Sequence, residues 1–185
     1  DTGASYDRDP RSTAERAEAY LVSSGIGDQS FWGPEAEFFL FDDVRFSNKI
    51  NKVSYEVDAS DASWNTDTEY EMGNLGHRPG VKGGYFPVNP TDAAQDLRSE
   101  MLSTMKNIGM KVDKHHHEVA SCQHELGLVF GSLTKQADEL QKYKYIIHNV
   151  ANAYGKSATF MPKPIAGDNG TGMHGIVHSA AFFTN

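Results

Sequence analysis

The sequence predicts an α+β protein in which hairpin-linked strands pack against two long helices on one side. Short segments such as 35–42 and 51–58 are aromatic or alternate in polarity, as strands do. Two longer segments, one after Thr91 and one across 134–154, carry apolar residues at helical spacing. Glycine-rich stretches separate these elements, and no repeat or low-complexity run interrupts them.

The composition indicates one globular domain and excludes several functional classes. With 185 residues, 38% of them hydrophobic and 23% charged, the chain is long enough to bury a core. The formal net charge of −8 argues against nucleic-acid binding, because no basic stripe is available to meet phosphates. No apolar run approaches the ~20 residues that cross a bilayer, so no membrane role is expected.

The single cysteine, Cys122, rules out an intrachain disulfide. It indicates a reducing compartment, and we therefore expect a cytoplasmic protein. Residues 1–5 contain neither an initiator Met nor the pattern of a signal peptide. We expect the chain to be truncated at both ends.

The first helix is expected from Arg11 to Ser24. Asp9 suits the capping position, Pro10 suits the first turn, and Gly25 suits the end of the helix. Its modest apolar face consists of Ala14, Ala17 and Leu21.

Strands are expected at Glu35–Asp42, which follows the breaker pair Gly33-Pro34, and at Asn51–Asp58. The polar, Gly-rich stretch Ala59–Pro90 that follows is long for a compact domain, and such loops are usually functional or disordered. Its segment Arg78–Pro87 is too rigid and aromatic for plain disorder, which favours an active-site loop.

The second half of the chain alternates helices and strands. Thr91 is expected to cap a helix that ends at Gly109. Strands at Lys111–Val119 and His124–Phe130 are joined by a tight turn, and the longest helix follows at Thr134–Tyr154. The apolar residues at helical spacing in the first of these helices are Leu97, Met101, Met105 and Ile108. The predicted buried side of the longest helix consists of Leu140, Ile147, Val150, Ala151 and Tyr154.

The last predicted elements are a strand at Ser157–Pro162, a loop at Pro164–Gly172 and a strand that begins near Met173. Within the loop, Gly167–Gly172 is rich in Gly, Asp and Asn, and His174 follows directly. Glycine-rich loops allow backbone amides to approach an anionic ligand. The pattern is weak by itself, because such residues are common in ordinary turns.

Two carboxylates, Glu35 and Glu37, lie two residues apart on the first predicted strand. Side chains at this spacing point to the same face, ~7 Å apart. They repel and raise each other's pKa unless a cation or hydrogen bonds compensate. A solvated strand face with Glu chosen for solubility explains these two residues about equally well.

A histidine-rich cluster, His115–Glu118, is followed by His124 and Glu125. On an alternating strand His116 and Glu118 share a face, whereas the other two histidines share the opposite face. Glu118 and Glu125 flank the predicted turn, so a hairpin would bring them together. The alternative is a pair of core histidines with incidental surface ones, which this density of histidine makes less favourable.

Together these segments supply four glutamates and one histidine. Carboxylate ligands with few sulfurs suit Mg²⁺ or Mn²⁺ rather than a structural zinc ion. Two such cations near a nucleotide indicate phosphoryl transfer, in which positioning and charge neutralisation provide most of the catalysis.

Four motifs resemble, in order, the signatures of type I bacterial glutamine synthetases. They are Gly33–Asp42, His77–Pro87, His115–Ala120 and Lys163–His174. Asp7–Arg11 and Tyr143–Tyr145 also match, so the resemblance runs from about residue 6 to residue 174.

The resemblance implies part of a catalytic domain, with a curved, mainly antiparallel sheet and helices on its outer side. An amino-terminal β-grasp domain and the C-terminal part of the catalytic domain would be absent. It implies a glutamate–ammonia ligase of nitrogen assimilation that uses ATP and passes through γ-glutamyl phosphate. The parent would be a homo-oligomer, a dodecamer in this family, with sites between subunits. The isolated piece is expected to be inactive.

The resemblance also implies roles for individual residues. Glu37, Glu118 and Glu125 would hold one Mg²⁺ or Mn²⁺ ion, and Glu35 and His174 a second. The substrate contacts would come from Asn169 and Gly170 for glutamate, His116 near its carboxylate, Tyr85 for ammonium, and Asp113 and Phe130 for the nucleotide.

Two departures from the family pattern are visible. The turn between Val119 and Glu125 is one residue shorter than in many members, and residues 175–179 lack the expected spacing of His and Ser. We therefore assign no nucleotide role to the segment after His174. Two alternatives remain: a ligase that joins glutamate to an amine or polyamine, and an inactive piece that binds metal or nucleotide weakly.

Overall fold

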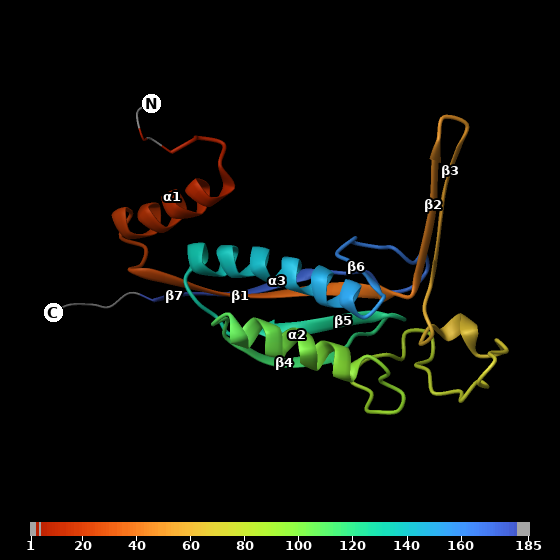
Figure 1. Cartoon of the computed structure of the whole chain (residues 1–185). Coiled ribbons are helices and arrows are strands. Elements are labelled where there is room, and N and C mark those ends of the chain that lie inside the picture. Colours follow the sequence, from red (N-terminus) through yellow and green to blue (C-terminus); the bar gives the residue numbers. More distant parts are fainter. Residues whose placement is uncertain (1–2, 4, 181–185) are drawn as a thin grey trace.

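The computed structural model describes residue 3 and residues 5–180, and its centre is an antiparallel sheet (Figure 1). Four strands follow the order β4-β5-β1-β6, and β7 also pairs with β1. Their bounds are Gln29–Phe41 for β1, Val112–His117 for β4, Gln123–Leu128 for β5, Ser157–Thr159 for β6 and Met173–Ala180 for β7.

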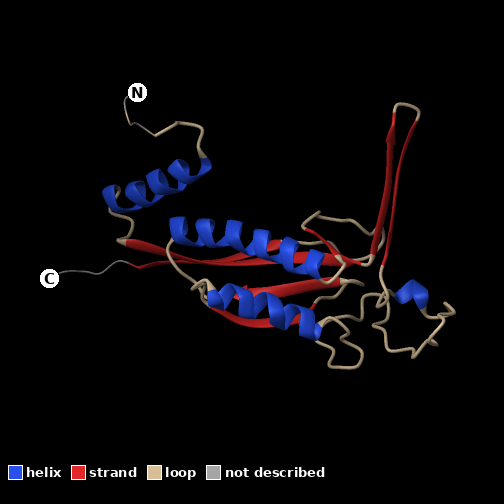
Figure 2. Ribbon diagram, in the orientation of Figure 1, coloured by secondary structure: helices blue, strands red, loops and turns tan. Residues whose placement is uncertain are grey.

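Three α-helices accompany the sheet: α1 at Pro10–Ser23, α2 at Gln95–Asn107 and α3 at Leu133–Ala153. Helices α2 and α3 lie side by side against one face of the sheet, and α1 packs on α3 (Figure 2). The predicted α+β class, with a mainly antiparallel sheet and helices on one side, is confirmed. No helix in the described part of the chain has the length and apolar character needed to cross a membrane.

The core lies between the sheet and the two helices. Phe38 and Leu40 of β1 and Leu126 of β5 point toward α2 and α3, where Met101 and Ile147 complete the packing. Because side chains alternate along a strand, the residues between them point to the opposite face. At one end of that face Phe39 and Phe41 pack in a second buried cluster, and α2 and α3 leave the rest of the face open. That open face carries the glutamates.

Strand β1 organises this arrangement because it pairs along both of its edges. Its residues 37–39 pair with β5, residues 29–36 pair with β7, and residues 39–41 pair with β6. The prediction that the strand begins only after Gly33-Pro34 is wrong, since Pro34 is paired opposite Gly175 within the ladder. Pro34 is paired along the β7 edge alone, because the β5 ladder begins at Glu37, and proline is tolerated where one edge of a strand lacks a ladder partner.

The sequence predicted only one of the two strands of a hairpin, the strand at Asn51–Asp58. Strands β2 (Asp43–Lys49) and β3 (Lys52–Asp58) form a two-stranded ribbon that extends away from the main sheet (Figure 1). The segment 59–90 after it contains only a short 3-10 helix, η1 at Ser63–Asn65, among the described elements. The prediction of a long loop in this segment is therefore confirmed.

The helix ends show which of the predicted capping residues do cap a helix in the structure. Asp9 caps α1 through a 2.7 Å hydrogen bond from the amide of Ser12, as predicted. Thr91 does not cap α2, which begins later at Gln95, with Ala94 at the capping position. Ile108 and Tyr154 occupy C-terminal cap positions and are 57% and 53% exposed, so the predicted burial of Tyr154 is wrong.

Candidate active site

The acidic face is built by cross-strand pairing. Glu37 of β1 stands opposite Glu125 of β5, and Glu125 in turn stands opposite His116 of β4. All three side chains are buried, with exposures of 6–9%. Residues far apart in the sequence thus meet on one face.

Glu118 joins this group from the end of β4. His116 Nε2 lies 2.7 Å from Glu118 Oε1 and 4.0 Å from Glu125 Oε2. A carboxylate only accepts hydrogen bonds, so the imidazole carries its hydrogen on Nε2. Ligand atoms of His116, Glu118 and Glu125 lie within 4.8 Å of one another. With Nε2 of His116 protonated, the two carboxylates are the members of this group that could hold a metal ion.

Glu35 and His174 form a second pair beside the first. They are cross-strand partners in the ladder of β1 and β7. Glu35 is half-buried and His174 is exposed, so the pair lies nearer to solvent than Glu37 and Glu125 do. The predicted residues of the two metal sites are therefore neighbours on the same sheet.

Burial shifts the pKa values of two of these carboxylates, Glu37 and Glu125. Burial raises the pKa of Glu37, although a hydrogen bond from the amide of Gly172 opposes this shift. Burial also raises the pKa of Glu125 to about 7; His116 opposes this shift, whereas Glu118, Glu35 and Glu37 reinforce it. A cluster of this kind favours a counterion, because opposite charge stabilises the ionised carboxylates.

Gln123 is a site residue that sequence reasoning missed. It is 1% exposed, and its Nε2 donates to Glu37 Oε2 at 2.9 Å and to the carbonyl of Gly170 at 3.0 Å. The amide of Gly172 also donates to Glu37 Oε2, at 2.7 Å. Gln123 lies two residues before Glu125 on β5, so strand alternation alone could have placed it on the acidic face.

The loop before β7 approaches the acidic face through its backbone. Asp168 is buried, and its carboxylate accepts hydrogen bonds from the amide of Ser121 at 3.1 Å and from the amide of Asn169 at 2.9 Å. A Cβ on Gly170 would come within 2.6 Å of the carbonyl of Pro162, so this position requires glycine. Asn169 and Gly170 thus have fixed backbones beside Glu37.

Tyr85 and Phe86 lie over His116 from the long loop. The Phe86 ring stacks on the His116 ring with centroids 4.2 Å apart, and the Tyr85 ring meets it edge-on at 5.7 Å. Tyr85 is 61% exposed, so its phenol is available to a ligand. The predicted active-site loop does reach the acidic face.

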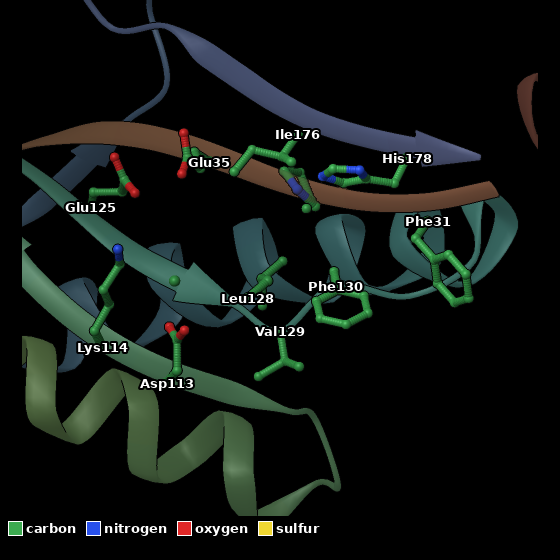
Figure 3. Close-up of a pocket in the computed structure, with 13 residues that line it drawn as sticks. Phe31, Glu35, Asp113, Lys114, Glu125, Leu128, Val129, Phe130, Ile176 and His178 are labelled. Carbon is green, nitrogen blue, oxygen red and sulfur yellow. The ribbon is translucent and has the colours of Figure 1, made fainter. Parts of the chain in front are cut away.

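A pocket of about 630 Å³ extends from this face between β1, β4, β5 and β7. Glu35 and Glu125 lie at one end, whereas Phe31 and Phe130 lie at the other (Figure 3). Asp113 lines the wall, and so do Lys114, Ile176 and His178. His178 lies in the segment after His174 to which the sequence assigned no nucleotide role. Two predicted metal residues, Glu35 and Glu125, therefore share one continuous pocket with the predicted nucleotide residues, whereas Glu37, Glu118 and His174 do not line it.

Comparison with known proteins agrees with this geometry. Residues 7–180 match the family described as "Glutamine synthetase, catalytic domain". The chain belongs to the glutamine synthetase family. The match extends to residue 180, so it includes the segment after His174 in which the family spacing of His and Ser is absent.

Individual glutamine synthetases are similar over nearly the whole chain. That of Cereibacter sphaeroides is 71% identical over 174 residues, which cover 94% of this chain and 37% of that protein. That of Escherichia coli is 59% identical over 170 residues, 91% of this chain and 36% of that protein. The structure of Plasmodium falciparum glutamine synthetase superposes with a TM-score of 0.86 at 28% identity, covering 97% of this chain and 35% of that one. The chain therefore spans little more than a third of these relatives.

Proposed function

We propose that this chain forms the metal-binding and nucleotide-binding walls of a glutamate–ammonia ligase. The observation that supports this proposal most is the convergence of Glu35, Glu37, Glu118, Glu125 and His174 beside one elongated pocket. The reaction would be the formation of glutamine from glutamate, ammonia and ATP. Identities of 59–71% with bacterial glutamine synthetases support this activity over ligation of a larger amine.

The donor set fits Mg²⁺ or Mn²⁺. The donors are carboxylate oxygens and imidazole nitrogens, with no thiolate, because Cys122 is buried elsewhere and burial keeps its pKa well above the usual range. His116 Nδ1 is buried and lacks a hydrogen-bond partner among the described residues, as expected beside a site for a polar ligand.

In this proposal Glu37, Glu118 and Glu125 hold one ion, and Glu35 and His174 hold another. When bound, the ions neutralise the phosphates of ATP and polarise the carboxylate that accepts the phosphoryl group. Gln123 and the amide of Gly172 keep Glu37 Oε2 occupied, which leaves its other oxygen to face the ion.

The pocket would take the nucleotide. We propose that the base lies toward Phe130, whose ring meets Phe31 edge-on at 5.8 Å, and that the phosphates lie toward Glu35 and Glu125. Asp113 projects from the wall between these ends, and Lys114 extends toward Glu125 (Figure 3). Along the pocket the aromatic rings therefore come first, Asp113 next and the glutamates last. This order suits a base, a sugar and cation-bound phosphates in turn.

Glutamate would bind on the loop side. Asn169 and Gly170 offer a fixed backbone, and His116 lies close enough to approach the substrate carboxylate. The γ-carboxylate would attack the terminal phosphate of ATP, which gives γ-glutamyl phosphate and ADP. Ammonia would then displace phosphate, with Tyr85 placed at the rim to help bind the incoming ammonium.

The complete activity would require more than this chain. We propose that it belongs to a cytoplasmic homo-oligomer, a dodecamer, with sites between subunits that also contain a β-grasp domain and the rest of the catalytic domain. The chain spans only 37% of a relative such as that of Cereibacter sphaeroides, which supports an inactive isolated chain.

A chimaeric enzyme tests the proposal. Residues 7–180 replace the matching segment of the Cereibacter sphaeroides glutamine synthetase, and glutamine is measured with glutamate, ATP and either ammonia or a larger amine. We expect ATP-dependent glutamine formation that prefers ammonia. A folded chimaera without this activity, or one that prefers the larger amine, would contradict the proposal.

A further inference from the structure

His117 lies beneath the active-site loop, on the face of β4 opposite His116. It is fully buried, with 0% exposure, and its ring meets the ring of His124 edge-on with centroids 4.7 Å apart. Its Nδ1 lies 2.9 Å from the carbonyl oxygen of Gly84 and 2.7 Å from that of Glu118. Carbonyl oxygens only accept, so Nδ1 carries a hydrogen that these two acceptors share.

This hydrogen joins two parts of the proposed site. Gly84 directly precedes Tyr85 and Phe86, the rings that lie over His116, and Glu118 is a proposed metal ligand. Two backbone bonds extend the connection: Gly84 N donates to the carbonyl of Val119 at 3.1 Å, and Phe86 N donates to that of His117 at 3.2 Å. The loop is thus attached to the end of β4 at three points.

The conformation of the loop requires such an attachment. Lys82 and Phe86 have φ angles of +56° and +57°, in a region that residues with side chains adopt rarely. Strained backbone of this kind persists only where surrounding contacts hold it. A Cβ on Gly84 would come within 2.4 Å of the carbonyl of Glu118 and 2.8 Å of the His117 ring, so the backbone of the loop lies directly against the histidine.

A metal site at His117 is the competing explanation, since its ligand atoms lie within 4.8 Å of those of Asp61 and His124. Arg98 Nη1 contacts His124 Nδ1 at 3.0 Å, and arginine can only donate. His124 therefore carries its own hydrogen on Nε2. Burial and the nearby positive charges also lower the pKa of His124 well below its usual value. His124 therefore offers no lone pair to an ion. The ligand atoms that remain are His117 Nε2 and Asp61 Oδ2, 3.4 Å apart, and these are fewer than a structural metal site uses.

We propose that His117 is a positioning residue, which holds the Tyr85 loop and the Glu118 backbone together through one shared Nδ1–H. The inference deepens the proposed function, because these two parts would contribute the ammonium contact and a metal ligand. His117 itself touches neither substrate nor ion.

Two substitutions in this chain distinguish the effect of losing the hydrogen bond from the effect of losing the imidazole ring. His117→Asn keeps an N–H donor near the position of Nδ1, whereas His117→Leu removes the donor. Limited digestion with trypsin measures how firmly the loop is held, because Lys82 is followed by Gly83, whereas Arg78 precedes Pro79 and resists cleavage. Cleavage at Lys49 and Lys52, at the tip of the β2–β3 hairpin, serves as the internal reference.

For His117→Leu we expect cleavage after Lys82 to be faster by about tenfold, the order expected for loss of a buried hydrogen bond, while cleavage at the hairpin tip is unchanged. Mn²⁺ affinity should fall by about 10- to 100-fold, as when a group that orients a ligand is removed. His117→Asn should stay close to the wild-type chain in both measurements. Gly84→Ala, which forces the loop away from an intact His117, should also speed cleavage, with Gly80→Ala as its unstrained control.

The inference is overturned if His117→Leu and Gly84→Ala are cleaved after Lys82 like the wild-type chain. It is equally overturned if Asn and Leu behave alike, or if cleavage at the hairpin tip rises in parallel. Should His117→Leu fail to fold, the comparison of Gly84→Ala with Gly80→Ala decides. Absence of Mn²⁺ binding by the wild-type chain would count against the proposed function, whereas the cleavage result would stand independently.

Discussion

Glu37 and Glu125 stand directly opposite each other on the antiparallel strands β1 and β5, and both are largely buried. Like charges in this relationship destabilise a sheet, and burial adds to the cost. A bound divalent cation reverses both effects. The stability of the folded chain should therefore depend on Mg²⁺ or Mn²⁺.

Addition of metal should raise the melting temperature. At a concentration 100 times the dissociation constant, a single bound ion adds ~2.7 kcal/mol to the free energy of unfolding. For a chain of this size that corresponds to an increase of ~5–10 °C. Thermal unfolding followed by circular dichroism, with and without EDTA, measures the shift. A melting temperature that does not respond to millimolar Mn²⁺ would contradict the expectation.

Gln123→Leu should weaken metal binding without removing a ligand. The substitution keeps the side chain's size but frees Glu37 Oε2 and the carbonyl of Gly170 from their shared donor. Affinity for Mn²⁺ should fall ~10- to 100-fold, as for other groups that orient metal ligands. Gln141→Leu, on the exposed side of α3, is the matched control and should bind normally.

Tyr143→Phe should destabilise the sheet. The buried hydroxyl of Tyr143 donates to the carbonyl of Ala36 at 2.7 Å and accepts from the amide of Leu126 at 3.2 Å. It therefore ties α3 to β1 and β5 next to Glu37 and Glu125. Its removal leaves two buried backbone groups unpaired, at a cost of ~1–3 kcal/mol in the free energy of unfolding. Urea denaturation measures this cost, and Tyr145→Phe, at a position that is 70% exposed, should show none.

Arg98→Met should be more damaging than loss of a surface ion pair. Arg98 is 1% exposed, and both of its terminal nitrogens bind Asp92, with an Nη1–Oδ1 distance of 2.8 Å. Removal of one partner from a buried pair leaves the other charge uncompensated, which typically costs ~3–5 kcal/mol. Arg45→Met breaks exposed pairs with Asp43 and Glu56 and should cost ~1 kcal/mol at most. Equal urea midpoints for the two variants would disprove this view of Arg98.

Local patterns predicted the helices and the functional face, because each is a property of nearby residues. Helical spacing located α2 and α3, and strand alternation placed His116 with Glu118. By contrast, β2 carries only Val44 and Phe46 as alternating apolar residues, which is too short a pattern to reveal a strand. The breaker signal at Gly33-Pro34 was overridden by the long ladder that residues 29–36 of β1 form with β7.

The site itself depends on register, which a single sequence does not contain. Nothing local indicates that Glu37 stands opposite Glu125, or that Glu35 stands opposite His174. The resemblance to glutamine synthetases supplied those groupings. It did not supply Gln123 or His117, whose importance follows only from the hydrogen bonds that they make.

The most direct test of this account is a titration of the chain with Mn²⁺, followed by electron paramagnetic resonance of the free ion. The wild-type chain and the control Glu100→Gln, which removes an exposed carboxylate of α2, should bind Mn²⁺ equally well. Glu37→Gln and Glu125→Gln should each weaken binding at least ~10-fold, because each removes a ligand. If the wild-type chain bound no Mn²⁺, or if both variants bound it as tightly as the control, the acidic face would not be a metal site.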